Sequence, residues 1–574
     1  MTLRSAEWFD RSDELGLQNR AVLRVIGWQP DLVRGKPIIG IANSWSELNN
    51  CNLGLRGIAE AVKRGVIAAG GVPLEFNTIS LGEELMKPSA MLYRNLMAME
   101  IEETLRAYPL DGVVLLCGCD KTTPAQLMGA ASANLPAIQL NAGPKATGKW
   151  RGQDTGSGTA LWKYWDEYRA GHISDDEWNE LEAVYAGGVG TCNTMGTAST
   201  MAAIAEALGM LLPGTSSIEA HGPRRMAAAE ATGRQIVDLV RRDIRPRQIM
   251  IGPAFENALR VHAAIGGSTN AIIHLLAIAG RLRVPLALDD FDRLSRDTPM
   301  LLNLQPAGDR LMADFDAAGG VPALMHELRD LLHLDCLTVT GMTLGESIAN
   351  ANNLDPEVIR PRAQPLQANS ALAVLRGNLA PRGAVLRLST AAPHLLQHTG
   401  PALVFNNYED MLARIDAPDL PVSADSVLVL RNAGAVGVPG LPEWGSIPIP
   451  KKLLQQGIRD IVRISDSRMS GTSYGTVVLH VTPEAAIGGP LALVRDGDLI
   501  GLDVAQRQLT LQVSDAELAR RRATWQPSPF MHARGYPRLY QQHVLQPDEG
   551  CDFDFLRPNN AAELAFVPPI VGRS

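Results

Sequence analysis

The stretch Gly112-Val-Val-Leu-Leu-Cys-Gly-Cys-Asp-Lys-Thr-Thr-Pro124 decides the fold class and carries the first chemical clue. It opens with a glycine and a run of apolar and β-branched residues, which is typical of a buried strand. Pro124 suits the first turn of a helix, so we expect a strand, a short loop and a helix in that order. The thiol, carboxylate and amine of Cys119, Asp120 and Lys121 then stand at a strand's carboxyl end, where α/β folds bind ligands.

The same alternation precedes this stretch. Residues 37–43 read as a buried strand that ends in a loop, and residues 55–69 read as an amphipathic helix closed by Gly70 and Gly71. Strands that alternate with helices predict an α/β domain with a parallel sheet. Helical patterns dominate from residue 197 to about residue 332.

The pattern changes near residue 365, after a Pro-rich stretch that reads as a linker. Short strands with few helices follow, and they predict a second domain that is a β-barrel or a sandwich, of which we favour the barrel-like form. We therefore expect an α/β domain over residues 1–365 and a β-barrel-like domain over residues 366–574, whose polar C-terminal stretch wraps the surface or a neighbour. The expected strands are two around Asn378 and Gly383, then 402–405, 426–430, 461–464, 476–481 and 509–513.

Composition excludes several classes of protein. Hydrophobic residues make up 46% and charged residues 20% of the 574, as in ordinary soluble proteins. Lys and Arg total 53 against 61 Asp and Glu, a net charge of −8 without a basic run, which argues against nucleic-acid and membrane-surface partners. The start has no apolar signal region, and no window reaches the ~18 apolar residues of a membrane helix. We expect a cytoplasmic protein.

Six cysteines are too few for a disulfide scaffold, and most could be small buried apolar residues. However, Cys51, Cys119 and Cys192 each lie in a loop just before a predicted helix, where the helix N-terminus favours a thiolate. Thiolates from three distant loops suit an iron–sulfur cluster or zinc. Three ligands leave one metal position open, as a Lewis-acid catalyst requires.

Acidic loop residues and one serine complete the candidates. Glu83, Glu84, Asp120 and Glu443 could bind a hard divalent ion such as Mg²⁺, although any one of them could equally be a solvated loop acid. Ser470 lies in a turn after a predicted strand and could be an exposed nucleophile, part of an anion-binding turn or simply a turn residue. No histidine accompanies it at a fixed local spacing, so a Ser–His–Asp hydrolase is not supported.

Four motifs in this order resemble the dihydroxy-acid and phosphogluconate dehydratase family, and the resemblance covers nearly the whole chain. The aromatic segment 150–173 is similar to the sugar-acid (aldonate) branch, of L-arabinonate or D-xylonate type. Ser467-Arg-Met469 stands where branched-chain members tend to have Gly-Arg-Phe, and Gly82-Glu83 where they have Asp-Gly. The motifs are Cys117-Gly-Cys-Asp-Lys-Thr-Thr-Pro124, Gly190-Thr-Cys-Asn-Thr-Met-Gly196, Gly266-Gly-Ser-Thr-Asn270 and Ser465-Asp-Ser-Arg-Met-Ser-Gly471.

The resemblance implies cofactors and residue roles. A [2Fe–2S] cluster would be held by Cys51, Cys119 and Cys192, and Mg²⁺ by Glu83, Asp120, Glu443 and a carbamylated Lys121. Ser470 would be the catalytic base, with Thr472 binding substrate, and Cys117 receives no role.

The resemblance also implies a hydro-lyase that converts a 2,3-dihydroxy sugar acid, most simply a pentonate, to a 2-keto-3-deoxy acid. We expect its active site between the two domains and a homodimer or homotetramer as the assembly. Two alternatives are a branched-chain dihydroxy-acid dehydratase of isoleucine and valine synthesis, and a non-catalytic regulator that binds a metal or a cluster.

Overall fold

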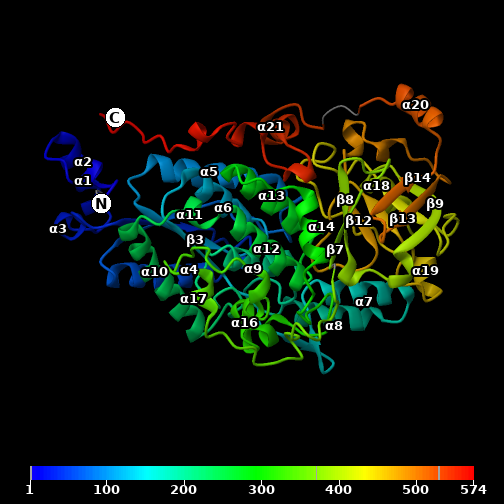
Figure 1. The fold of residues 1–574 in the computed structure, drawn as a ribbon, viewed down its shortest axis with the longest axis horizontal. Coiled ribbons are helices and arrows are strands. Elements are labelled where there is room, and N and C mark those ends of the chain that lie inside the picture. The colour runs from blue at the N-terminus through cyan, green and yellow to red at the C-terminus, as the bar shows by residue number, and fades with distance from the viewer. Residues whose placement is uncertain (1–2, 370, 528–530, 574) are drawn as a thin grey trace.

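The first half of the computed structural model is built on a four-stranded parallel sheet, as predicted (Figure 1). The structure describes residues 3–369, 371–527 and 531–573. Every residue of β1, β3 and β4 is buried, because helices α5 and α6 cover one side of the sheet and α4 and α10 the other. In the order β2-β1-β3-β4, the strands are β2 (Val72–Asn77), β1 (Ile38–Asn43), β3 (Gly112–Cys117) and β4 (Ala137–Asn141).

Helices surround this sheet and fill most of the first half of the chain. Short helices precede it: α1 (Ala6–Phe9), α2 (Glu14–Val25) and α3 (Pro30–Val33). Its crossover helices are α4 (Leu55–Ala68), α5 (Arg94–Ala107) and α6 (Thr122–Ala133). The later helices are α9 (Thr197–Ala207), α10 (Pro223–Arg242), α11 (Pro246–Ile249), α12 (Gly252–Ala264), α13 (Asn270–Leu282), α14 (Leu288–Arg296), α15 (Met312–Ala317), α16 (Gly320–Glu327) and α17 (Leu344–Ile348).

The aromatic segment forms its own small unit, which the sequence pattern did not resolve. A hairpin of β5 (Gly148–Trp150) and β6 (Gln153–Thr155) leads into α7 (Thr159–Ala170) and α8 (Asp175–Ala186). Helix α7 packs against α19 (Lys451–Gln455), so this segment of the first half reaches the second (Figure 1).

The second half is an eight-stranded sheet that curls into a nearly closed barrel, which confirms the barrel-like prediction. The edges β7 and β14 meet at a bridge between Arg376 and Gln508. There the Arg376 N–H donates to Arg507 O at 2.9 Å, and the Leu509 N–H donates to Arg376 O at 2.8 Å. The strands, in the order β14-β13-β9-β10-β11-β12-β8-β7, are β14 (Gln508–Leu511), β13 (Leu499–Asp503), β9 (Gln397–Phe405), β10 (Val427–Leu430), β11 (Arg463–Ser465), β12 (Val477–Thr482), β8 (Gly383–Arg387) and β7 (Leu372–Leu375).

Side chains alternate between the inside and the outside of the barrel, as strand geometry requires. Val427 and Val429 of β10 belong to the interior core, whereas Leu428 and Leu430 pack outward against α18 (Tyr408–Arg414) and α19. The outer face of β7, β8 and β12 shares its hydrophobic core with the first half, so the halves are joined by apolar packing.

The C-terminal stretch wraps the surface, as expected, and fastens both halves together (Figure 1). It carries α20 (Asp515–Thr524) and α21 (Gly535–His543), and the segment after α21 returns to the first half. Asp552 accepts two hydrogen bonds from the fully buried Arg281, at 2.5 and 3.0 Å. Arg382, next to β8, binds Asp548 of the same segment at 2.8 Å. Within the described part of the chain, no helix combines the length and apolarity needed to cross a membrane.

Candidate active site

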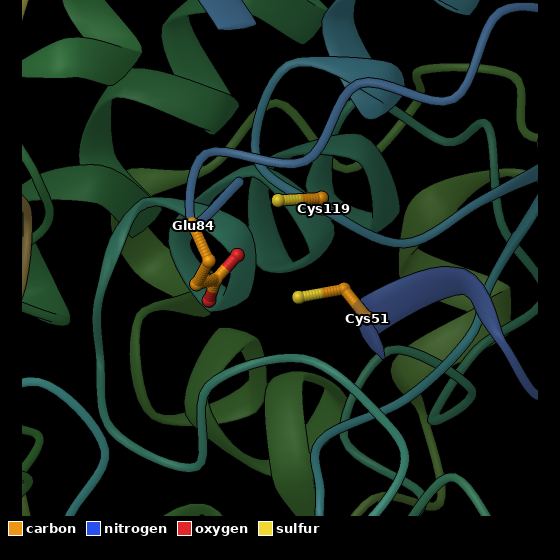
Figure 2. A group of neighbouring side chains, drawn as sticks. All are labelled: Cys51, Glu84 and Cys119. Atoms are coloured by element: carbon orange, nitrogen blue, oxygen red, sulfur yellow. The ribbon is translucent and has the colours of Figure 1, made fainter. Parts of the chain in front are cut away.

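The predicted thiol ligands come together at helix starts. Cys51 lies in a 3₁₀ turn before α4, Cys119 between β3 and α6, and Cys192 in the loop before α9. The Sγ atoms of Cys51 and Cys119 and a carboxylate oxygen of Glu84 all lie within 4.8 Å of one another, facing a common space (Figure 2). Cys192 is not a member of this close group, but burial and the charges of Glu84 and Cys119 raise the pKa of its thiol.

Asn52 fixes the spacing between two of these thiol loops. Its Oδ1 accepts the Cys119 N–H at 3.0 Å, and its Nδ2 donates to Ser44 O at 2.9 Å and to Ser80 Oγ at 3.1 Å. A side chain on Gly118 would collide with Asn52 Oδ1, so only glycine lets the two loops approach this closely.

The predicted metal ligands surround Lys121, whose side chain is fully buried. Its Nζ forms an ion pair with Asp120 Oδ2 and lies 3.6 Å from Glu83 Oε2 and 3.7 Å from Glu443 Oε1. Glu443 comes from the barrel half and the other three residues come from the first half, so both halves build this cluster. We call these four residues, together with Arg468, the carboxylate cluster.

Arg468 is a member of the carboxylate cluster that sequence reasoning did not select. Its Nη1 lies 2.5 Å from Glu443 Oε1 and its Nη2 lies 3.1 Å from Glu83 Oε1. Burial opposes charge on Glu83, but Lys121 and Arg468 outweigh it and lower the pKa of Glu83 to about 2. At Glu443 burial dominates and raises the pKa of the carboxyl.

The carboxylate cluster fits a divalent cation. Its three carboxylates face two cationic side chains, so the group keeps a negative charge that a cation would balance. Glu83 Oε2 is buried and has no hydrogen-bond partner, which leaves an oxygen donor unused. Hard oxygen donors are the set that Mg²⁺ prefers. The neighbouring thiols are the soft donors that suit an iron–sulfur cluster.

Ser470 and Thr472 adjoin this cluster through Asn270. Asn270 Nδ2 donates to Glu443 Oε1 at 2.9 Å and to Met469 O, next to Ser470, at 3.1 Å. Ser470 Oγ lies 2.8 Å from Thr472 Oγ1, so the candidate base has a hydroxyl partner.

Helix α7 contacts this serine turn from the outside. Trp162 Nε1 donates to Thr472 Oγ1 at 3.0 Å, and Thr159 Oγ1 donates to Thr472 O at 2.9 Å. Asp120 Oδ1 lies 3.5 Å from Cys119 Sγ, which joins the thiols to the carboxylate cluster. These contacts link Cys51, Cys119, the carboxylate cluster and the serine turn in one region, whereas a surface cavity of about 1040 Å³ between α14 and the barrel lies elsewhere.

Comparisons with known proteins show which family the chain matches. Residues 36–347 match the family model described as dihydroxy-acid/6-phosphogluconate dehydratase N-terminal, and residues 357–551 match the corresponding C-terminal model. The chain belongs to this dehydratase family. The predicted family is confirmed, and the protein is a hydro-lyase.

Three relatives resemble the dehydratase over almost all of both chains. A "6-deoxy-6-sulfo-D-gluconate dehydratase" of Pseudomonas putida is 52% identical over 571 residues, 99% of this chain and 98% of the relative. An "L-arabinonate dehydratase" of Rhizobium leguminosarum bv. trifolii is 51% identical over 557 residues, 97% and 96% of the two chains. An "L-arabonate dehydratase" of Azospirillum brasilense is 50% identical over 571 residues, 98% of each chain.

Three residues of the dehydratase site were missed from the sequence: Asn52, Trp162 and Arg468. Arg468 carried a signal, because a lone cation inside the small-residue motif 465–471 suggests a buried partner of opposite charge. Glu84 was predicted with Glu83 as a possible Mg²⁺ ligand, and the structure places its carboxylate beside the thiols of Cys51 and Cys119 instead.

Proposed function

We propose that this dehydratase removes water from a 2,3-dihydroxy sugar acid, a pentonate such as L-arabinonate or D-xylonate, and releases a 2-keto-3-deoxy acid. Relatives half identical to it over nearly their full length carry sugar-acid names, which supports this substrate class. The observation that carries the proposal is the meeting of thiols, carboxylates and Ser470 in one site built by both halves.

We infer two cofactors. Cys51, Cys119 and Cys192 would hold a [2Fe–2S] cluster, while Glu83, Asp120, Glu443 and a carbamylated Lys121 would hold Mg²⁺. When bound, they supply Lewis acidity at the leaving C3 hydroxyl and at the carboxylate end of the substrate. Carbamylation would turn the Lys121 amine into an oxygen donor, which suits a hard cation.

Ser470 Oγ would accept the proton from C2 of the substrate. The Trp162 N–H can only donate, so Thr472 Oγ1 accepts it and turns its own proton toward Ser470 Oγ, 2.8 Å away. This second hydrogen bond would stabilise the serine oxygen as it loses its proton. The C3–O bond then breaks, the departing hydroxyl takes up the proton that Ser470 Oγ accepted and leaves as water, the deprotonated serine is restored, and the enol tautomerises to the ketone.

Specificity for a sugar acid would come from polar groups that meet its distal hydroxyls, because such sites strongly reject analogues lacking them. Helix α7 is the element closest to the serine turn that brings aromatic and polar side chains. We infer that it lines the distal end of the substrate site.

Anaerobic assays of the purified protein test this function. We expect higher kcat/KM on L-arabinonate or D-xylonate than on D-gluconate, 6-deoxy-6-sulfo-D-gluconate or 2,3-dihydroxyisovalerate. A preference for 2,3-dihydroxyisovalerate would refute the sugar-acid assignment. Ser470→Ala should keep its iron and its colour but lose turnover, and a fully active Ser470→Ala would remove the serine from its role as base.

We also infer a cytoplasmic homodimer or homotetramer. Exposed apolar side chains on α2, with Leu17 at 68% and Val25 at 87% exposure, support burial against another subunit. Light scattering of the purified protein measures the assembly, and a monomer would contradict it.

A further inference from the structure

Glu84 and Glu83 are adjacent in sequence but their side chains serve different groups. Glu83 turns to Lys121 and Arg468 in the carboxylate cluster. Glu84 turns the other way, and its carboxylate oxygen lies within 4.8 Å of the Sγ atoms of both Cys51 and Cys119 (Figure 2). One loop therefore supplies a donor to each of the two inferred cofactor sites.

The Glu84 carboxylate forms no hydrogen bond or ion pair with another described residue, that is, within residues 3–369, 371–527 and 531–573. Glu84 is an exposed residue, yet its carboxylate lies beside the Sγ atoms of the buried Cys51 and Cys119.

The donor count of the inferred cluster leaves a place for this carboxylate. A [2Fe–2S] cluster takes four outer protein ligands, two on each iron, and the three cysteines fill three of them. We propose that Glu84 is the fourth protein donor, and that its carboxylate occupies the remaining outer position when no substrate is bound. This inference rests on the proposed function, because it assumes that the thiols hold a cluster.

An oxygen donor at this position has a chemical advantage over a fourth thiolate. Soft thiolates bind cluster iron more firmly than a carboxylate does. The Glu84 oxygen can therefore give way to a substrate hydroxyl, while in the resting protein it keeps other ligands from that iron. No electron is transferred in this exchange, since one oxygen donor replaces another.

Spectroscopy of the loaded protein tests the proposal without relying on turnover. Wild type, Glu84→Gln and a matched control, Glu47→Gln, are prepared anaerobically with ⁵⁷Fe. Glu47 is an exposed acid of the loop that precedes Cys51 and does not belong to the group of Cys51, Glu84 and Cys119, so the control removes the same charge outside that group. Iron and sulfide are counted first, and Mössbauer spectra are then compared.

We expect all three proteins to carry two iron atoms per chain, the count of a [2Fe–2S] cluster. The Mössbauer parameters of one iron site should change in Glu84→Gln alone, and its iron should pass to a chelator about tenfold faster. Adding the preferred sugar acid to wild type should move its spectrum toward that of Glu84→Gln.

Identical spectra for Glu84→Gln and wild type would overturn the proposal while leaving the proposed function intact. An iron-free wild type would overturn both. If Glu84→Gln assembles no cluster yet melts at the temperature of the wild-type apoprotein, the carboxylate is needed for assembly, which supports its role as a donor. Glu84→Asp, which keeps the oxygen donor, should restore the cluster in that case.

Discussion

Replacing Trp162 by phenylalanine removes one hydrogen-bond donor from the serine turn while keeping an aromatic ring on α7. The lost contact is the 3.0 Å hydrogen bond from Nε1 to Thr472 Oγ1. Without it the Thr472 hydroxyl is no longer held with its proton toward Ser470, 2.8 Å away. We therefore expect a smaller fraction of Ser470 to be deprotonated, and so available as the base, at a given pH in Trp162→Phe.

The size of the effect follows from the hydrogen bond that is lost. A net value of about 0.5–1.5 kcal/mol corresponds to a fall in kcat of roughly two- to tenfold. The same energy raises the apparent pKa on the acid limb of the kcat profile by about 0.4–1 unit. Because Trp162 positions the base, KM should change less than kcat.

The assay is the pH dependence of kcat on the preferred sugar acid, with Trp165→Phe as the matched control. Trp165 lies on the same helix with similar exposure, 38% against 36%, but it stacks on Tyr168 and Trp178 instead. Unchanged kcat in Trp162→Phe, or equal losses in both variants, would refute the reasoning. A change confined to KM would make Trp162 a substrate contact.

Three further changes have defined outcomes. Asp552→Asn removes the carboxylate that pairs with fully buried Arg281, so the free energy of unfolding should fall by about 3–5 kcal/mol in urea titrations, and a change below 1 kcal/mol would contradict the pairing. Lys121→Met removes the amine at the centre of the carboxylate cluster, and calorimetry should show Mg²⁺ affinity at least about tenfold weaker, whereas unchanged affinity would exclude the lysine as a ligand. Burial raises the pKa of Glu206 to about 7 from an ordinary 4.5, so the folded state binds more protons than the unfolded state between these values and stability falls as pH rises through that window. Glu206→Gln should flatten this part of the plot of melting temperature against pH, and an unchanged slope would exclude Glu206 as its source.

The helices and strands that were predicted correctly are those marked by a clear residue pattern within their own segment. Strand β3 lies where the apolar run 112–117 placed it, and the parallel sheet follows from the alternation around it. Strand β13 (Leu499–Asp503) was missed, because Gly501 and Asp503 dilute its alternating pattern and resemble a turn. Helix α7 was missed because aromatic residues are weak helix formers.

The candidate site was predictable only where a motif marked it. The contact between Arg468 and Glu83 joins residues 385 positions apart, and it exists only once the two halves have docked. The divergence of Glu83 and Glu84 depends on the path of one loop, which residue types do not encode. The boundary between residues 365 and 366 and the roles of the site residues stay predictions.

The returning segment around Asp552 has a consequence for how the molecule is made. A ribosome releases this segment after every element that it fastens, so until synthesis is almost finished Arg281 has only Glu102 as an acidic partner and Arg382 has not met Asp548. Until then the buried guanidinium of Arg281 lacks its two hydrogen bonds to Asp552, and the halves are joined by apolar packing and by the polar contacts of the carboxylate cluster. A tag or truncation that hinders the last stretch should therefore reduce the yield of folded enzyme, although the residues that carry out the chemistry lie far upstream.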